Sequence, residues 1–417
     1  MITSFKFDNC FAFNKPVEMN LRADMRTKKF YTNVSNINDN LNVLKSIAIY
    51  GPNNTGKTSF INCIKAIKDT LENKYAKLEY NIFNKSTICY EGISFIYNSK
   101  EYLYEYKYDC KDHSYIYEKM VEIIRDKNKN ESEEIIFLRD SQNNIYKCPK
   151  DEELKKVLNI ASTNNILIYT VQTEKFKALQ KIKEILTNVA ENLEIIDMNN
   201  IPNSKTIEML KKKDEESKKI VEFIKNADIY LDDYRYDENL KIEIDGKEAE
   251  EKILKNQVLM EQIKLVSVYK GKAVPSILFD SLGTRKIAAL ASYVITAIKK
   301  GKTLIVDELD SSLHFKITRA IISMFNNEIN KEAQLIASLH DISLLDCKKM
   351  FRKEQIWFTD KTEEQTELYS LKDFSYQDTG IRDTSDIQDK YSKGVFGAIP
   401  DPDLISTLLE VDYDEKI

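Results

Sequence analysis

The spacing of apolar and polar residues changes along the chain and divides the sequence into three regions. Residues 1–150 mostly alternate apolar and polar positions, which is typical of half-buried β-strands. From 151 to 270, Leu, Ile, Lys and Glu recur at helical spacing, so a mostly helical insertion is predicted. Residues 271–417 return to strands alternating with helices, which predicts a largely parallel sheet.

The first region is predicted to hold two groups of strands. Residues 1–21 indicate two short strands around a turn, and a period-two series of aromatic residues over 88–140 indicates a meander. Between them, the apolar run 44–50, a glycine-containing loop and a helix from Thr58 form a strand–loop–helix unit. We therefore expect 1–150 to supply the first part of a nucleotide-binding head together with an antiparallel β lobe.

The other two regions are predicted mainly from helical periodicity. Helices are expected over 173–193 and 207–228, and the charged run 211–219 is interpreted as a solvated helix face, with a contact surface as the alternative. In the last region, helices and strands are predicted at 284–299, 302–308, 313–328, 333–338, 355–360 and 366–371.

The segment 51-GPNNTGKT-58 has the spacing G-x-x-x-x-G-K-[ST] of a phosphate-binding loop. Its glycines can take positive φ and bring backbone N–H groups close to phosphates. Lys57 is predicted to reach the β- and γ-phosphates, and the Thr58 hydroxyl to bind Mg²⁺. The predicted nucleotide contacts are Gly51, Pro52, Asn53, Asn54, Thr55, Gly56, Lys57, Thr58 and Ser59. A chance glycine turn is disfavoured because the chain has only 10 glycines.

The segment 304-LIVDELD-310 carries two adjacent carboxylates at the end of an apolar strand. Asp307 is predicted to bind Mg²⁺, directly or through water, and Glu308 to polarise the attacking water. Acidic pairs often only face solvent, so this prediction depends on the phosphate loop being present in the same chain.

Two more segments carry candidate chemistry. Ser281, Gly283 and Thr284 open a helix shortly before the acidic strand, where hydroxyl and N–H groups can donate to an anion; an ordinary N-cap is the alternative. His340 follows the apolar strand at 334–338, a place suited to sensing a γ-phosphate, whereas His314 is interpreted as a packing or interface residue.

Composition limits the class of protein and the cellular environment that the sequence fits. With 42% apolar and 31% charged residues, about two compact lobes with a soluble surface are expected. The net charge of −5 argues against a uniformly basic nucleic-acid surface but leaves a local patch open. The six cysteines lack paired metal-ligand spacing, and we find neither a secretory signal nor a membrane-length apolar run. A cytoplasmic protein without membrane contact is expected.

Together these segments resemble an ABC-type ATPase head of the SMC/RecF class, in particular the RloA-like ATPases of bacterial phage-defence and abortive-infection systems, including AbiL and PARIS-type ATPases. The resemblance covers most of the chain. The segment 281-SLGTRK-286 is similar to the family's S-x-G-T-[KR] signature, and 307-DELDSSLH-314 and 338-SLHD-341 to its acidic motif with D-loop and its switch histidine. The opening 4-SFKFDNCFAF-13 and the tail over 355–400 are also similar to that family.

The resemblance implies an α/β fold, an ABC-type P-loop ATPase head with an N-terminal antiparallel β lobe and a helical insertion. It further implies that two heads sandwich ATP and Mg²⁺, with Ser281 and Gly283 of one head acting on the γ-phosphate held by the other. Asp310 is then expected to communicate across the interface, and His340 to steady the transition-state charge. The glutamine that couples Mg²⁺ to the insertion is not obvious, and Gln172 is the candidate.

The motifs and the resemblance favour a homo-oligomeric ATPase, slow in turnover, that acts as sensor or scaffold for a separately encoded effector in abortive infection. The resemblance implies that this effector is a nuclease. A phage protein is the candidate trigger. Two alternatives remain open: a RecF-like DNA-maintenance ATPase that contacts DNA, and an assembly module that ATP locks without hydrolysis. A GTPase is disfavoured because no [NT]KxD motif occurs, and a transporter because Leu282 stands where its signature has glycine. Too little chain follows His340 for an OLD-type nuclease centre.

Overall fold

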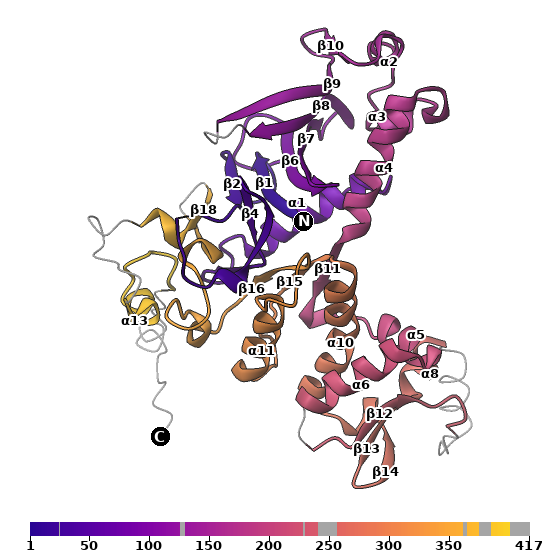
Figure 1. Cartoon of the computed structure of the whole chain (residues 1–417), viewed down its shortest axis with the longest axis vertical. Coiled ribbons are helices and arrows are strands. Elements are labelled where there is room, and N and C mark those ends of the chain that lie inside the picture. The colour runs from indigo at the N-terminus through magenta and orange to yellow at the C-terminus, as the bar shows by residue number, and fades with distance from the viewer. Residues whose placement is uncertain are drawn as a thin grey trace, which may run out of the picture.

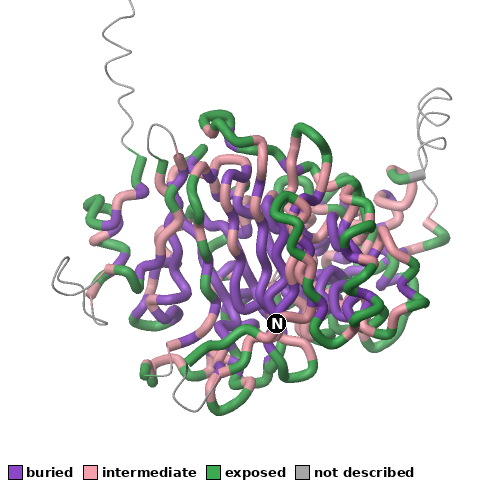
Figure 2. Tube along the Cα trace, turned by 90° about the horizontal axis from the view of Figure 1, so that it is seen from above, coloured by how far each residue is buried: buried purple, intermediate pink, exposed green. Residues whose placement is uncertain are grey.

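The structure is a computed structural model that describes residues 1–24, 26–125, 130–227, 230–240, 257–361, 365–374 and 385–400. Figure 1 shows three parts: an antiparallel β lobe at the top, a mainly parallel sheet in the middle, and a smaller lobe at the lower right. In Figure 2 the buried positions gather along the strands in the middle of the molecule, and exposed positions lie on the surrounding loops and helices.

The central sheet has six strands in the order β11-β15-β16-β5-β17-β18. They are β5 (Ser46–Tyr50), β11 (Leu193–Asp197), β15 (Thr303–Asp307), β16 (Gln334–Ser338), β17 (Ile356–Lys361) and β18 (Thr366–Ser370). All neighbours are parallel except β18, which runs antiparallel to β17. The predicted parallel sheet is therefore confirmed.

Helices cover both faces of this sheet, as a parallel sheet requires. Ile47 and Ile49 of β5 pack into a core with α1 (Lys57–Leu71) and α4 (Lys177–Asn192). The alternate residues Ala48 and Tyr50 pack into a second core on the opposite face. That second core is built with α10 (Leu282–Lys300) and α11 (Phe315–Phe325). The strands are apolar on both faces because both are buried.

The β lobe is a seven-stranded antiparallel sheet in the order β10-β9-β8-β7-β6-β1-β2. Its strands are β1 (Ile2–Asp8), β2 (Val17–Asn20), β6 (Ile88–Tyr97), β7 (Lys100–Asp109), β8 (Ser114–Arg125), β9 (Glu131–Asp140) and β10 (Ile145–Lys147). Tyr102, Tyr104 and Tyr106 alternate along β7 and are all buried, which explains the aromatic periodicity of the sequence. The predicted meander is confirmed.

A buried glutamine is one link between the two sheets, beside the hydrophobic core that they share. Gln334, at the start of β16, accepts a hydrogen bond from the Ile2 backbone N–H at 2.6 Å and donates to the Ile2 and Leu44 carbonyls at 2.9 and 3.0 Å. Its side chain is fully buried, so each of these bonds replaces one that water would otherwise make. The β lobe is thereby fixed to the head.

The smaller lobe, described over 204–227, 230–240 and 257–279, differs from the predicted insertion. It contains α5 (Ser204–Lys212), α6 (Glu215–Ala227), β12 (Asp233–Tyr236), α8 (Gln257–Ile263), β13 (Leu265–Tyr269), β14 (Lys272–Pro275) and α9 (Ser276–Phe279). The region 151–270 is not one helical unit, because β11 within it belongs to the central sheet. The expected helix over 207–228 is two helices, since Lys213 takes a left-handed φ of 52° between α5 and α6.

Short elements complete the described chain. They are β3 (Val34–Asn38), β4 (Leu41–Leu44), α2 (Glu152–Leu158), α3 (Leu167–Thr170), α13 (Ile387–Ser392), and the 3-10 turns η1 (Tyr31–Asn33), η2 (Thr173–Lys175), η3 (Met198–Asn200), η4 (Ile342–Leu344), η5 (Lys353–Gln355) and η6 (Leu371–Asp373). Over the described residues, no helix is both long and apolar enough to cross a membrane.

Candidate nucleotide site

The phosphate loop connects β5 to α1, as predicted. Gly51 and Gly56 have φ of 154° and 105°. A side chain at Gly51 would meet Thr359 of β17, and one at Gly56 would meet Thr366 of β18. Both positions therefore require glycine for backbone angle and for space. Thr55 is buried and its hydroxyl lies 2.8 Å from that of Thr359, which fixes the loop against β17. Asn53 and Asn54 are exposed at the loop tip.

Lys57 is folded back over this loop. Its Nζ donates to the Gly51 and Pro52 carbonyls at 2.7 and 2.8 Å. Burial lowers the pKa of the Lys57 ammonium, and the Asp307 carboxylate partly opposes that shift. The loop that is predicted to wrap the phosphates also holds this ammonium. A bound triphosphate would supply the negative charge that stabilises the buried cation.

The loop and the acidic strand meet through two side chains. Thr58 Oγ1 donates to Asp307 Oδ2 at 2.8 Å, and Ser338 Oγ at the end of β16 donates to Asp307 Oδ1 at 2.5 Å. Adjacent oxygen ligands of an octahedral Mg²⁺ at about 2.1 Å lie about 3 Å apart, so the Thr58 and Asp307 oxygens are spaced to hold this ion. When bound, Mg²⁺ would neutralise phosphate charge and polarise the reacting phosphoryl group.

Glu308 takes a left-handed backbone conformation with φ of 53°, which is uncommon for a residue other than glycine. Its N–H donates to Ser338 Oγ at 2.7 Å. One carboxylate oxygen, Oε1, lies 3.8 Å from His340 Nε2, and the other, Oε2, accepts a hydrogen bond from Asn199 Nδ2 at 2.7 Å. The Glu308 side chain is 36% exposed, so it remains accessible to water.

Asp310 joins the D-loop to the segment after β16. Its Oδ2 accepts hydrogen bonds from the backbone N–H groups of His340 and Asp341 at 2.7 and 2.6 Å. Its Oδ1 is buried and has no hydrogen-bond partner within the described part of the chain. A buried carboxylate oxygen without a donor is costly.

The Ser281 turn begins α10. Ser281 Oγ accepts a hydrogen bond from the Thr284 N–H at 3.1 Å and lies 3.0 Å from Thr284 Oγ1, so Ser281 is the N-cap of this helix. A Cβ on Gly283 would lie 2.8 Å from the Ser312 carbonyl, so glycine lets this turn pack closely on the D-loop. The turn lines a cavity of 1120 Å³ together with residues of α6 and α11 and with none of residues 51–59.

Large apolar residues flank Ser281 in the sequence. Leu278, Phe279 and Leu282 are 69%, 65% and 53% exposed. We name these three residues the apolar rim. Clusters of exposed apolar side chains are typical of interaction sites.

The structure does not bring Gln172 to the nucleotide site. Tyr169, three residues earlier, donates its hydroxyl hydrogen to the Leu71 carbonyl at 2.6 Å, at the C-terminal end of α1. The phosphate loop lies at the other end of this 15-residue helix, which is about 22 Å long. The expectation for Gln172 is therefore corrected.

Asn199 lies in the site instead, and sequence reasoning missed it. β11 pairs in parallel with β15, which places Asp197 opposite Asp307 and brings η3 beside Glu308. The available signal was the turn 198-MNN-200 directly after an apolar strand. Its importance depends on which strand β11 pairs with, and the sequence pattern did not specify that.

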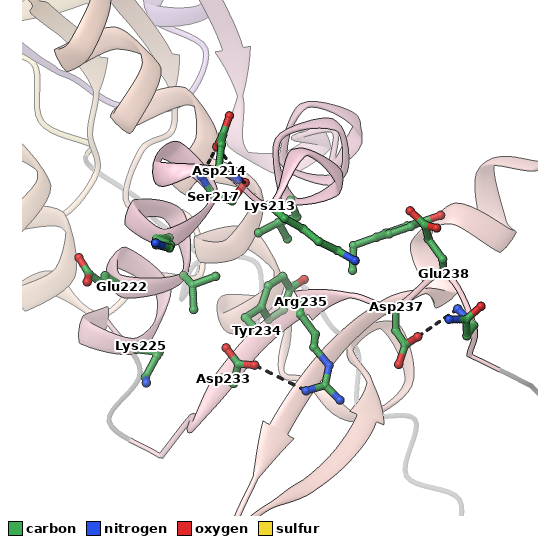
Figure 3. A pocket seen from close by; sticks show the side chains of 15 residues that line it. Lys213, Asp214, Ser217, Glu222, Lys225, Asp233, Tyr234, Arg235, Asp237 and Glu238 are labelled. Atoms are coloured by element: carbon green, nitrogen blue, oxygen red, sulfur yellow. Dashed lines mark hydrogen bonds and ion pairs between the residues drawn. The ribbon is translucent and has the colours of Figure 1, made fainter.

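A second pocket, of 640 Å³, lies in the smaller lobe between α6 and β12 (Figure 3). Side chains of both charges line it, and Arg235 forms an ion pair with Asp233 at 3.8 Å. None of the predicted site residues lines this pocket. It is separate from the nucleotide site.

The parallel sheet, the contact between the phosphate loop and the acidic strand across it, and the adjoining antiparallel lobe define an ABC-type P-loop ATPase head. The chain belongs to the family described as "AAA domain, putative AbiEii toxin, Type IV TA system", whose model matches residues 46–346. No curated protein sequence matches the chain.

Two solved structures are similar over most of the chain. One is the SMC head domain from Thermotoga maritima, with a TM-score of 0.42 and 11% identity, covering 88% of this chain and 98% of that one. The other is an SMC head bound to the C-winged helix domain of ScpA, with a TM-score of 0.45 and 13% identity, covering 88% of this chain and 97% of that one.

Proposed function

We propose that the protein binds ATP with Mg²⁺, hydrolyses it slowly, and uses this cycle to control a separately encoded effector. The contact between Thr58 Oγ1 and Asp307 Oδ2 at 2.8 Å carries this proposal. These two oxygens come from the phosphate loop and the acidic strand, and they stand where one Mg²⁺ ion would bind both.

The neighbouring side chains have the chemistry that hydrolysis needs. Lys57 binds the β- and γ-phosphates, and Glu308 accepts a proton from the attacking water. His340 lies beside the Glu308 carboxylate, with its Nε2 3.8 Å from Oε1, and steadies charge on the γ-phosphate. Phosphoryl transfer depends mainly on positioning and charge stabilisation, and these few groups are the contribution of one chain to both.

A second copy of the chain completes the site in this proposal. The Ser281 turn is open to solvent beside the apolar rim, and it presents a helix N-terminus that favours an anion. When two heads meet, Ser281 and Gly283 of one contact the γ-phosphate bound by the other. ATP would then link the two molecules, and its hydrolysis would release them.

The smaller lobe would carry this change to a partner. Thr206 of α5 donates its hydroxyl hydrogen to the Ala288 carbonyl of α10 at 3.0 Å, and Ile220 and Ile224 pack in the same core as Ala288 and Ala291. Because the lobe is packed on the helix that begins at Ser281, it moves with that helix. The family is described as a putative toxin of a toxin–antitoxin system, which agrees with a role in abortive infection. In this proposal the effector is a nuclease and a phage protein is the trigger.

Substitution of Glu308 tests this function. Glu308→Gln should lower kcat for ATP hydrolysis about 100-fold or more, because it removes the general base while retaining shape. ATP binding and ATP-dependent dimerisation should persist. Glu328→Gln, an exposed carboxylate before β16, is the matched control. Unchanged hydrolysis in Glu308→Gln would reject the assignment of the base.

The genes beside this one test the choice of effector. A neighbouring nuclease gene whose product co-purifies with this chain, and is released or activated with ATP, supports effector control. Neighbouring replication genes together with tight duplex-DNA binding would favour the DNA-maintenance alternative.

A further inference from the structure

Asn199 links three segments through hydrogen bonds: the turn that carries Glu308, the D-loop at Ser311 and, through Ser311, the helix α10. Asp197 lies opposite Asp307 in the pairing of β11 with β15, so the turn η3 that follows β11 runs beside the turn that carries Glu308. Asn199 is the second residue after this pairing ends. It is placed by strand register and is close to Glu308 although the two are 109 residues apart in sequence.

Both ends of the Asn199 amide are used. Nδ2 donates to Glu308 Oε2 at 2.7 Å, and Oδ1 accepts a hydrogen bond from Ser311 Oγ at 2.8 Å. A carboxylate accepts hydrogen bonds and cannot donate when ionised, so the amide nitrogen must face Glu308. The orientation of the amide therefore follows from its partners.

The same line of hydrogen bonds continues to α10. Lys286 is buried, and its Nζ donates to Ser311 Oγ at 3.0 Å and to Ser312 Oγ at 3.3 Å. Every donor in the series Lys286, Ser311, Asn199 points towards Glu308. The series begins at an ammonium on the helix capped by Ser281 and ends at a carboxylate after β15.

We infer that Asn199 is a positioning residue that holds the Glu308 carboxylate and ties it to α10 through Ser311 and Lys286. One carboxylate oxygen is fixed by the amide, which leaves the other, on the His340 side, to accept a proton from water. The inference rests on the proposed hydrolysis for its effect on rate. The contact itself does not depend on hydrolysis.

Steady-state kinetics measure the effect on rate. Asn199→Ala should lower kcat about tenfold with KM unchanged, because Glu308 loses the group that orients it while nucleotide contacts remain. Ser311→Ala should lower kcat about threefold, since only the support of Asn199 is lost. Asn200→Ala is the matched control, because Asn200 Nδ2 donates to Asp197 Oδ2 at 2.7 Å instead. A wild-type kcat in Asn199→Ala would overturn the inference.

A polarity swap measures the contact without hydrolysis. Asn199→Asp places two carboxylates against each other and should lower Tm by about 2 °C or more. Adding Glu308→Gln should restore Tm, because the new amide can donate to the new carboxylate. Purely additive Tm changes would overturn the inference. If the wild-type protein hydrolyses no ATP, the proposed function fails, and this thermal cycle still decides whether Asn199 holds residue 308.

Discussion

The phosphate-loop side and the Ser281 side of the molecule are built very differently. On the first, Thr58, Asp307 and Ser338 are joined by hydrogen bonds of 2.5 to 2.8 Å within one chain. On the Ser281 side, the Ser281 hydroxyl contacts Thr284 of its own turn. Each residue of the neighbouring apolar rim is more than half exposed. One side holds its groups in place by itself, and the other presents groups to solvent.

This difference teaches where a second molecule is required. A preorganised set of side chains can bind nucleotide and metal within one chain. Exposed apolar side chains differ, because the free energy falls when another surface covers them. Substitutions on the two sides should therefore differ in whether their effects depend on protein concentration.

The largest effect is expected at Lys57. Lys57→Ala removes a buried ammonium from the loop that encloses the phosphates, which should weaken ATP binding by about 2 kcal/mol or more, about 30-fold. Equilibrium titration with a fluorescent ATP analogue measures this at any protein concentration. Lys65→Ala, an exposed lysine on the same helix, is the control. Undiminished binding would contradict the loop assignment.

Mixing two inactive variants tests whether the two sides belong to different molecules in one site. Lys57→Ala and Ser281→Arg should each be inactive alone. Their mixture should recover about a quarter of wild-type hydrolysis, because half of a random mixture is heterodimer and each heterodimer has one intact site. Mixing Lys57→Ala with Glu308→Gln should recover nothing, since both changes fall on the same side. Equal failure of both mixtures would argue against a shared site.

A smaller effect is expected in the apolar rim. Phe279→Ser should weaken ATP-dependent self-association about tenfold while the Tm of the monomer stays unchanged, because Phe279 is already 65% exposed. Sedimentation velocity with and without ATP measures this. Ile329→Ser, at a residue that is 83% exposed before β16, is the matched control. An equal loss in both variants would show that the rim is not the interface.

At Glu91 in the β lobe, a substitution is expected to change stability and leave hydrolysis unaffected. Burial raises the pKa of Glu91 to about 8 from 4.5, and the Tyr106 hydroxyl donates to it. The native state therefore binds a proton that the unfolded state releases above pH 4.5, so the free energy of unfolding falls as pH rises from about 4.5 to about 8.

Glu91→Gln should remove this pH dependence and raise Tm at pH 8, with hydrolysis unaffected. Thermal unfolding from pH 5 to pH 9 measures it, with the exposed Glu79→Gln as control. Parallel Tm curves for wild type and Glu91→Gln would mean that Glu91 is already ionised in the folded protein.

The parts of the fold that are encoded locally could be predicted. The apolar run before Gly51, the glycine spacing and the helix after it lie in one short segment, and so do the apolar strand and carboxylates at 304–308. Strand periodicity also identified the β lobe, because Tyr102, Tyr104 and Tyr106 alternate on one buried face. These elements depend on neighbouring residues, so the sequence pattern contains their signal.

Features that depend on distant pairing could not be predicted. Asn199 lies near Glu308 only because β11 is the neighbour of β15, and Gln172 was chosen by residue type without knowledge of that order. The break at Lys213 was missed because a lysine in a left-handed conformation leaves no glycine or proline in the sequence to mark it. Residues 207–228 therefore appeared as one long helix.

The order of strands in the central sheet also has a consequence for synthesis of the protein. β5, which leads into the phosphate loop, lies between β16 and β17, and these two strands are made about 280 and about 310 residues later. At 5–20 residues per second, a ribosome needs about 15–60 s to produce them. During that time the apolar segment 46-SIAIY-50 has neither of its strand neighbours, and such segments are prone to aggregate. A chain that ends before Gln334 should thus be insoluble, even though it contains the complete phosphate loop.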